Sequence, residues 1–139
     1  MKLRVRDLMT DRVFSVEPDE DLARLAELMD EIRVRHVPVV DEDKILVGLV
    51  SQRDLIRSVM FAASDLPLAE MRELLEVAEV RSIMTTGVET IEADADIEEA
   101  AQVMLENKMG CLPVVEGGRL TGILTEADFV KYVASHATI

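Results

Sequence analysis

The sequence is poor in cysteine and in aromatic residues. Its 139 residues include 1 cysteine, 1 tyrosine and 3 phenylalanines, and tryptophan is absent. A single cysteine excludes an intramolecular disulfide framework and is typical of a reducing compartment. With so few aromatic rings, the core must be built from aliphatic side chains and from the 8 methionines, which fill irregular gaps.

Basic residues are also scarce relative to acidic ones. Lysine and arginine total 15 against 28 aspartates and glutamates, which gives a formal net charge of −13. Nucleic acid and anionic membrane surfaces bind positive faces, so we expect neither as a partner. No apolar run approaches the ~20 residues of a membrane span. The first ten residues, MKLRVRDLMT, contain no apolar signal segment, and we therefore expect a cytoplasmic protein.

What the sequence does contain is an internal repeat. Four motifs occur twice in the same order. As pairs they are VRDLMT at 5–10 and VRSIMT at 80–85, VFSVEP at 13–18 and VETIEA at 88–93, HVPVV at 36–40 and CLPVV at 111–115, and GLVSQRD at 48–54 and GILTEAD at 122–128. Each repeat has only about 55 residues, which is marginal for an independent core. We therefore expect the repeats to share one core about a pseudo-two-fold axis, with any site at their seam present in two related copies.

Each repeat predicts the element order β-α-β-β-α, and hence an α+β fold. In the first repeat we expect a helical lead-in at 5–9, a strand at 14–16, a helix capped by Asp19, a hairpin of strands at 36–40 and 45–50, and a helix from Ser51. In the second we expect a helix capped by Asp94, strands at 111–115 and 120–124, and a helix from Thr125. The first helix of each repeat buries one face, because its apolar residues recur at helical spacing.

The stretch from Ile56 to Glu79 has no counterpart in the other repeat. We expect it to continue the preceding helix to Ala63, to break at 64–67, and to form a second helix at about 68–78. The predicted division is a first repeat at 1–64, a helical linker at 65–79 and a second repeat at 80–139. The apolar stripe of the linker helix either packs on its own module or forms a dimer contact; it consists of Leu68, Met71, Leu75 and Ala78.

The strongest candidate for a site is the turn between the last strand and the last helix of each repeat. Both copies read glycine, two apolar residues, and serine or threonine followed three residues later by aspartate, as in Ser51 to Asp54 and Thr125 to Asp128. Glycine permits close backbone approach, N–H groups at a helix start suit a phosphate, and a carboxylate can hold two ribose hydroxyls. The same pattern is a capping box, and its duplication weakens that structural interpretation without removing it.

Two further pairs of positions are candidates. Ser15 and Thr90 occupy equivalent places in the first strands, where a hydroxyl is usually solvated or bonded to backbone. The residues before each Pro-Val-Val, 33–37 and 108–112, include apolar side chains that can flank a purine ring. For each of these residues taken alone, packing in a core strand is the more common role.

This ordered set of motifs resembles a tandem pair of CBS domains, also called a Bateman module. The resemblance rests on five features that occur in the same order in both repeats: VxDLMT, a first strand, a helix, hhPVV and Ghh[ST]xxD, where h is an apolar residue and x is any residue. It covers nearly the whole chain. The extra stretch at 56–79 resembles small stand-alone bacterial and archaeal pairs, including proteins like the acetoin-utilisation regulator. The resemblance implies two βαββα repeats related by a pseudo-two-fold axis, packed sheet to sheet with the helices outside.

The resemblance also implies a function. Such pairs are regulatory modules that bind adenosine-containing ligands, namely AMP, ADP, ATP or S-adenosylmethionine, in two clefts between the repeats. They signal through a conformational or oligomeric change, so the implied partners are an adenosine ligand, a second copy of the chain and an unidentified effector protein that is regulated in trans. No cofactor is implied.

Carried over residue by residue, the resemblance assigns roles to positions in both repeats. Asp54 and Asp128 hold ribose, Ser51 and Thr125 lie near phosphate, and backbone beside the two Pro-Val-Val segments meets the base. On the family pattern Asp54 works with Thr90 and Cys111, and Asp128 with Ser15 and His36. The full candidate set is Ser15, Val16, Arg35, His36, Val37, Pro38, Ser51, Arg53 and Asp54 in the first repeat, and Thr90, Ile91, Cys111, Leu112, Pro113, Thr125 and Asp128 in the second.

The two copies are not equivalent. Arg53 lies inside the first turn, where the second has Ala127, and arginine is the better partner for a phosphate. We therefore predict that the Asp54 site binds a nucleotide phosphate more readily, although Arg33 and Arg35 are candidates to serve the Asp128 site.

No catalytic constellation is present in the sequence. Its two histidines, His36 and His136, lie far apart, and there is no CxxC, HExxH or Walker motif. We expect neither an enzyme nor a metal site. Two alternatives to a ligand-sensing module stay open: an interaction module that dimerises with empty clefts, and an enzyme that uses the cleft carboxylates.

Overall fold

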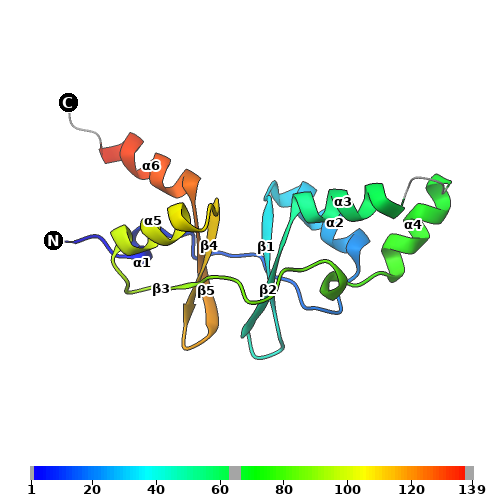
Figure 1. Cartoon of the computed structure of the whole chain (residues 1–139), viewed down its shortest axis with the longest axis horizontal. Helices are drawn as coiled ribbons and strands as arrows, with labels where there is room; N and C mark the ends of the chain where they lie inside the picture. Colours follow the sequence, from blue (N-terminus) through cyan, green and yellow to red (C-terminus); the bar gives the residue numbers. More distant parts are fainter. Residues whose placement is uncertain (1, 63–66, 137–139) are drawn as a thin grey trace. The chain divides into compact units, whose positions relative to one another are not determined.

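The computed structural model describes residues 2–62 and 67–136. The fold is α+β, as predicted, with one two-stranded and one three-stranded sheet. The chain divides into two compact units (Figure 1). Unit 1 combines residues 1–13 with 89–139, and unit 2 consists of residues 14–88.

Unit 2 contains most of the first repeat and the linker helix. Its elements are α2 (Leu22–Ile32), β1 (His36–Val40), β2 (Leu46–Ser51), α3 (Gln52–Ala62), α4 (Leu68–Val77) and the 3-10 turn η1 (Val80–Ser82). Strands β1 and β2 form the predicted antiparallel hairpin, and helices α2 and α3 lie on one side of it (Figure 1). The strand expected at 14–16 is reduced to a single parallel bridge between Val16 and Val39.

Unit 1 repeats this plan. Its elements are α1 (Val5–Leu8), β3 (Ile91–Glu92), α5 (Ile97–Glu106), β4 (Cys111–Glu116), β5 (Arg119–Thr125) and α6 (Glu126–His136). Strand β3 pairs in parallel with β4, and β4 pairs antiparallel with β5. The hairpin turns through Gly117 and Gly118 at φ of 59° and 84°, a left-handed conformation that favours glycine.

Each unit contains its own hydrophobic core, where a single shared core was expected. The core of unit 2 includes Leu22, Leu25 and Val37, all at most 1% exposed. The core of unit 1 includes Leu112 and Leu124, which are fully buried. Each core is completed by a buried valine from the start of the other repeat. Val5, from the lead-in of the first repeat (residues 5–10), belongs to the core of unit 1, and Val80, from the lead-in of the second repeat (residues 80–85), belongs to the core of unit 2.

The lead-in segments are therefore exchanged between the repeats. Thr10 forms a two-bond antiparallel bridge with Ile123, with N···O distances of 2.9 Å in both directions. Thr85 pairs in the same way with Leu49, at 2.9 and 2.8 Å. Each copy of the motif that ends in Met-Thr thus adds an edge to the hairpin of the other sequence repeat.

The first helix of each repeat begins two residues later than predicted. The N-cap residues are Asp21 and Asp96, not Asp19 and Asp94. Each helix is preceded by a turn, in which the Glu20 amide donates to the Glu17 carbonyl and the equivalent Ala95 amide donates to Glu92. The turn takes up the residues that were expected to start the helix.

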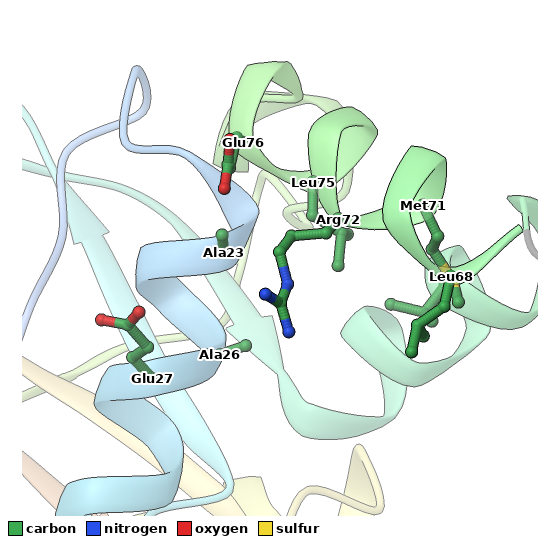
Figure 2. A pocket seen from close by; sticks show the side chains of 9 residues that line it. Ala23, Ala26, Glu27, Leu68, Met71, Arg72, Leu75 and Glu76 are labelled. Atoms are coloured by element: carbon green, nitrogen blue, oxygen red, sulfur yellow. The ribbon is translucent and has the colours of Figure 1, made fainter.

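The linker helix α4 packs on α2 and α3 of its own unit. Leu75 and Ala78 contact the core, whereas Leu68 at the start of the helix is 74% exposed. A cavity of about 570 Å³ lies between the three helices, and Figure 2 shows Arg72 projecting into it from α4. Its lining is Ala23, Ala26, Glu27, Val59, Leu68, Met71, Arg72, Leu75 and Glu76, so it includes none of the predicted site residues. No helix within the described ranges is long and apolar enough to cross a membrane.

Candidate ligand-binding turns

The structure places the two candidate turns at equivalent positions. Each lies where the second strand of a hairpin runs directly into a helix, at β2–α3 in unit 2 and at β5–α6 in unit 1. The strand register pairs His36 with Ser51 and Cys111 with Thr125. Each turn is therefore flanked by the residue that begins the Pro-Val-Val strand of its own repeat.

In unit 2 the turn is a capping box. The Asp54 amide donates to Ser51 Oγ at 3.0 Å, while Ser51 donates to Asp54 Oδ2 from its amide at 3.1 Å and from its hydroxyl at 2.8 Å. The structural interpretation of this motif is thus confirmed. Both bonds that the Asp54 carboxylate accepts use Oδ2, and its Oδ1 accepts none from the residues that the structure describes. One oxygen of a partly exposed carboxylate is therefore open to a further donor.

In unit 1 the corresponding carboxylate is more fully engaged. Asp128 Oδ2 accepts from the Thr125 amide at 2.8 Å and from the Thr125 hydroxyl at 3.2 Å. Its Oδ1 accepts from the hydroxyl of Thr10 at 3.2 Å. Asp128 is only 7% exposed and is the one buried charged residue in the described part of the chain. The sequence did not predict that Thr10 contacts this site, because the two similar lead-ins do not indicate which hairpin each of them joins.

The helix starts offer fewer free amides than the motif suggests. In unit 2 the Gln52 amide donates to the Arg35 carbonyl at 2.8 Å, and the Asp54 amide is used by the cap. In unit 1 the Glu126 amide donates to the Gly110 carbonyl at 3.2 Å. The amides of Gln52, Asp54 and Glu126 are therefore already engaged, by neighbouring backbone or by the cap, and are not free for a phosphate.

The glycine of each motif serves internal packing. A Cβ on Gly48 would lie 2.7 Å from Met84 Sδ and 3.0 Å from the Thr85 carbonyl oxygen. A Cβ on Gly122 would lie 2.6 Å from Met9 Sδ and 3.0 Å from the Thr10 carbonyl oxygen. The close backbone approach that these glycines permit is thus made by the exchanged lead-in and not by a ligand.

The residues that differ between the turns have different electrostatic environments. Partial burial lowers the pKa of His36 below its usual 6.5, with Asp54 opposing the shift and Arg35 adding to it. Burial, and then the nearby Asp128, raise the pKa of Cys111 to about 12. Cys111 is 2% exposed, so it is a protonated packing residue at neutral pH.

The remaining candidate residues fall into two groups. Six apolar ones belong to core strands or their edges and are buried: Val16, Val37, Pro38, Ile91, Leu112 and Pro113. Ser15 and Thr90 are partly buried, and Arg35 and Arg53 are exposed. The core interpretation of the apolar side chains is confirmed. The pairings implied between the two repeats stay predictions.

No group of three or more histidine, cysteine, aspartate or glutamate side chains in the described ranges is arranged to hold a metal ion.

The geometry of two hairpin-and-helix units, each with an Ser/Thr-x-x-Asp turn, matches a known family. The CBS domain family model matches the chain twice, over residues 5–61 and 80–135. The chain therefore belongs to the CBS domain family, as a tandem pair.

Three relatives are similar over nearly the whole chain. Hypoxic response protein 1 of Mycobacterium tuberculosis is 30% identical over 134 residues, covering 96% of this chain and 87% of its own length. The crystal structure of a Vibrio cholerae protein assigned to acetoin utilization (AcuB) is 33% identical, with a TM-score of 0.82 over 97% of this chain and 93% of that one. The crystal structure of CBSX2 in complex with AMP is 31% identical, with a TM-score of 0.79 over 95% of this chain and 96% of that one.

Other curated relatives are much longer than the matched region. The chain spans 32% of an uncharacterized protein of Methanocaldococcus jannaschii, at 30% identity. It spans 21% of the inosine-5'-monophosphate dehydrogenase of M. tuberculosis, at 36% identity. The similarity to this enzyme thus concerns a fifth of its length.

Proposed function

We propose that this protein is a regulatory module that binds an adenosine-containing ligand at its strand-to-helix turns. The observation that carries the proposal is the Asp54 carboxylate, which is fixed through Oδ2 and open at Oδ1. A carboxylate held in this way is pre-organised to accept hydrogen bonds from ribose hydroxyls. Support comes from CBSX2, whose structure of the same fold was determined with AMP.

The surroundings of Asp54 suit the rest of a nucleotide. Arg53 is exposed on the first turn of α3, directly before Asp54 in the sequence, and can pair with a phosphate. Ser51 lies at the helix start, where the helix dipole favours negative charge. Because unit 1 has Ala127 in place of Arg53, we propose that the Asp54 site binds nucleotide phosphate more readily than the Asp128 site. Separate AMP titrations of Asp54→Ala and Asp128→Ala test this, and loss of binding only in the second would contradict it.

The ligand would act by shifting an equilibrium between two states of the module. A ligand does so only by binding one state more tightly than the other. We propose a homodimer that signals in trans to an effector protein, because large apolar side chains are exposed on helices of both units. They include Met60 at 70%, Leu105 at 75% and Val130 at 67% exposure. The cytoplasmic location stays a prediction.

A second candidate is an interaction module that dimerises without a nucleotide. The capping box in unit 2 favours it, since it gives the Ser51-to-Asp54 motif a complete structural role. The two candidates differ in whether an adenosine ligand stabilises the fold. A catalytic function is not part of the proposal, because the enzyme relative is matched over only 21% of its length.

Thermal unfolding in the presence of AMP, ATP and S-adenosylmethionine separates the candidates. A ligand present at ~100 times its Kd should add about 2.7 kcal/mol to the free energy of unfolding. The matched control is 2'-deoxy-AMP, which lacks a ribose hydroxyl and should stabilise less. No shift with any adenosine ligand would favour the interaction module, and conversion of the bound nucleotide would indicate an enzyme.

A further inference from the structure

The two ribose-binding carboxylates of the proposed function differ in one contact. Asp128 accepts a hydrogen bond from Thr10, which belongs to the exchanged lead-in of the first repeat. The equivalent residue in unit 2 is Thr85, which forms the same backbone bridge but donates no side-chain hydrogen bond to Asp54 among the described residues. The oxygen that Thr10 occupies, Oδ1 of Asp128, is the counterpart of the oxygen left open on Asp54.

The position of Thr10 is fixed by groups other than its side chain. Its amide and carbonyl both pair with Ile123, and Met9 before it lies over Gly122. Thr10 itself is exposed, whereas Asp128 is 7% exposed. The backbone therefore holds Thr10, an exposed residue, beside the buried carboxylate of Asp128.

We propose that Thr10 lowers the affinity of the Asp128 site for an adenosine ligand, in addition to the effect of Arg53 at the Asp54 site, because the Thr10 hydroxyl competes with a ribose hydroxyl for Asp128. This inference rests on the proposed function. Binding at Asp128 requires a ribose hydroxyl to replace an internal donor, and binding at Asp54 does not. Hydrogen bonds to a charged acceptor are stronger than neutral ones, so the replacement costs affinity at Asp128.

The test uses the full chain with each site isolated in turn. Asp54→Asn leaves the Asp128 site, and Asp128→Asn leaves the Asp54 site; asparagine keeps an acceptor for the cap. Thr10→Val, which keeps the shape and removes the hydroxyl, is added to the first background. Its matched control is Thr85→Val in the second, and AMP binding is measured by calorimetry.

Thr10→Val should tighten AMP binding at the Asp128 site by about fivefold, and Thr85→Val should leave binding at the Asp54 site unchanged. Without ligand, Thr10→Val should lower the melting temperature more than Thr85→Val, because only Thr10 donates to a carboxylate. Unchanged or weaker AMP binding in the Thr10→Val variant would overturn the inference alone. Absence of AMP binding in every variant and in the unaltered chain would overturn the proposed function together with it.

Discussion

The sulfur of Met9 packs directly against Gly122, because a Cβ built on Gly122 would lie only 2.6 Å from Met9 Sδ. The same relationship joins Met84 and Gly48, at 2.7 Å. Both glycines are invariant between the two sequence repeats, as is the methionine of each lead-in. The duplicated motifs therefore encode a packing contact in which a lead-in lies against the hairpin of the other repeat.

Alanine at either of these glycines should destabilise the protein. Gly122→Ala and Gly48→Ala each force a methionine sulfur and a backbone carbonyl to move, at a cost of about 1–3 kcal/mol. Gly110→Ala is the matched control, because its nearest neighbour would be Glu126 at an ordinary 3.8 Å. Urea unfolding of the three variants measures the difference. Equal stability of Gly122→Ala and Gly110→Ala would contradict the packing role of the lead-in.

The hairpins and the last helix of each repeat were predictable from the sequence because their signals are local. β1 has the predicted bounds, and α3 and α6 follow Ser51 and Thr125 as expected. The helix caps were misplaced because Glu17–Glu20 and its counterpart form a turn ahead of the helix.

The exchange of the lead-ins could not be predicted, because two similar segments carry no information on which hairpin each one joins. Consequently the sequence located Asp54 and Asp128 but not the Thr10 contact that distinguishes them. The glycines were a usable signal, since a strand glycine indicates close approach of another backbone.

Stability should fall below neutral pH in part through His36. Its pKa lies below 6.5 in the folded protein, so the unfolded chain takes up the proton first as the pH decreases. The folded state then loses stability from about pH 6.5 downward, until the folded pKa is passed. Unfolding free energies of the unaltered chain and of His36→Gln, measured between about pH 5 and 7.5, should diverge in this sense. If the unfolding free energies of the two proteins depended on pH in parallel, the pKa of His36 would not be lowered in the folded state.

Cys111 should be unreactive in the folded protein. It is 2% exposed and its pKa is raised to about 12, so neither access nor thiolate is available. A thiol-specific reagent should label it only after denaturation. Rapid labelling of the native protein at neutral pH would mean that β4 opens or that the thiol is accessible.

Loss of the Ser51 hydroxyl should weaken the start of α3. Ser51→Ala removes the acceptor for the Asp54 amide and one donor to its carboxylate, at a cost of about 1 kcal/mol. Ser51→Thr keeps both roles and is the matched control. Thermal unfolding in the absence of ligand measures the effect, and equal stability of the alanine and threonine variants would contradict the capping role.

The most direct test of ligand sensing is a calorimetric titration of AMP into the unaltered chain and into the double variant Asp54→Asn/Asp128→Asn, with circular dichroism to verify that both are folded. The unaltered chain should bind AMP, and the double variant should lose affinity by about tenfold or more, because each ribose loses a charged acceptor. Equal affinity of the two folded proteins for AMP, or no binding by the unaltered chain, would contradict the assignment of these two carboxylates.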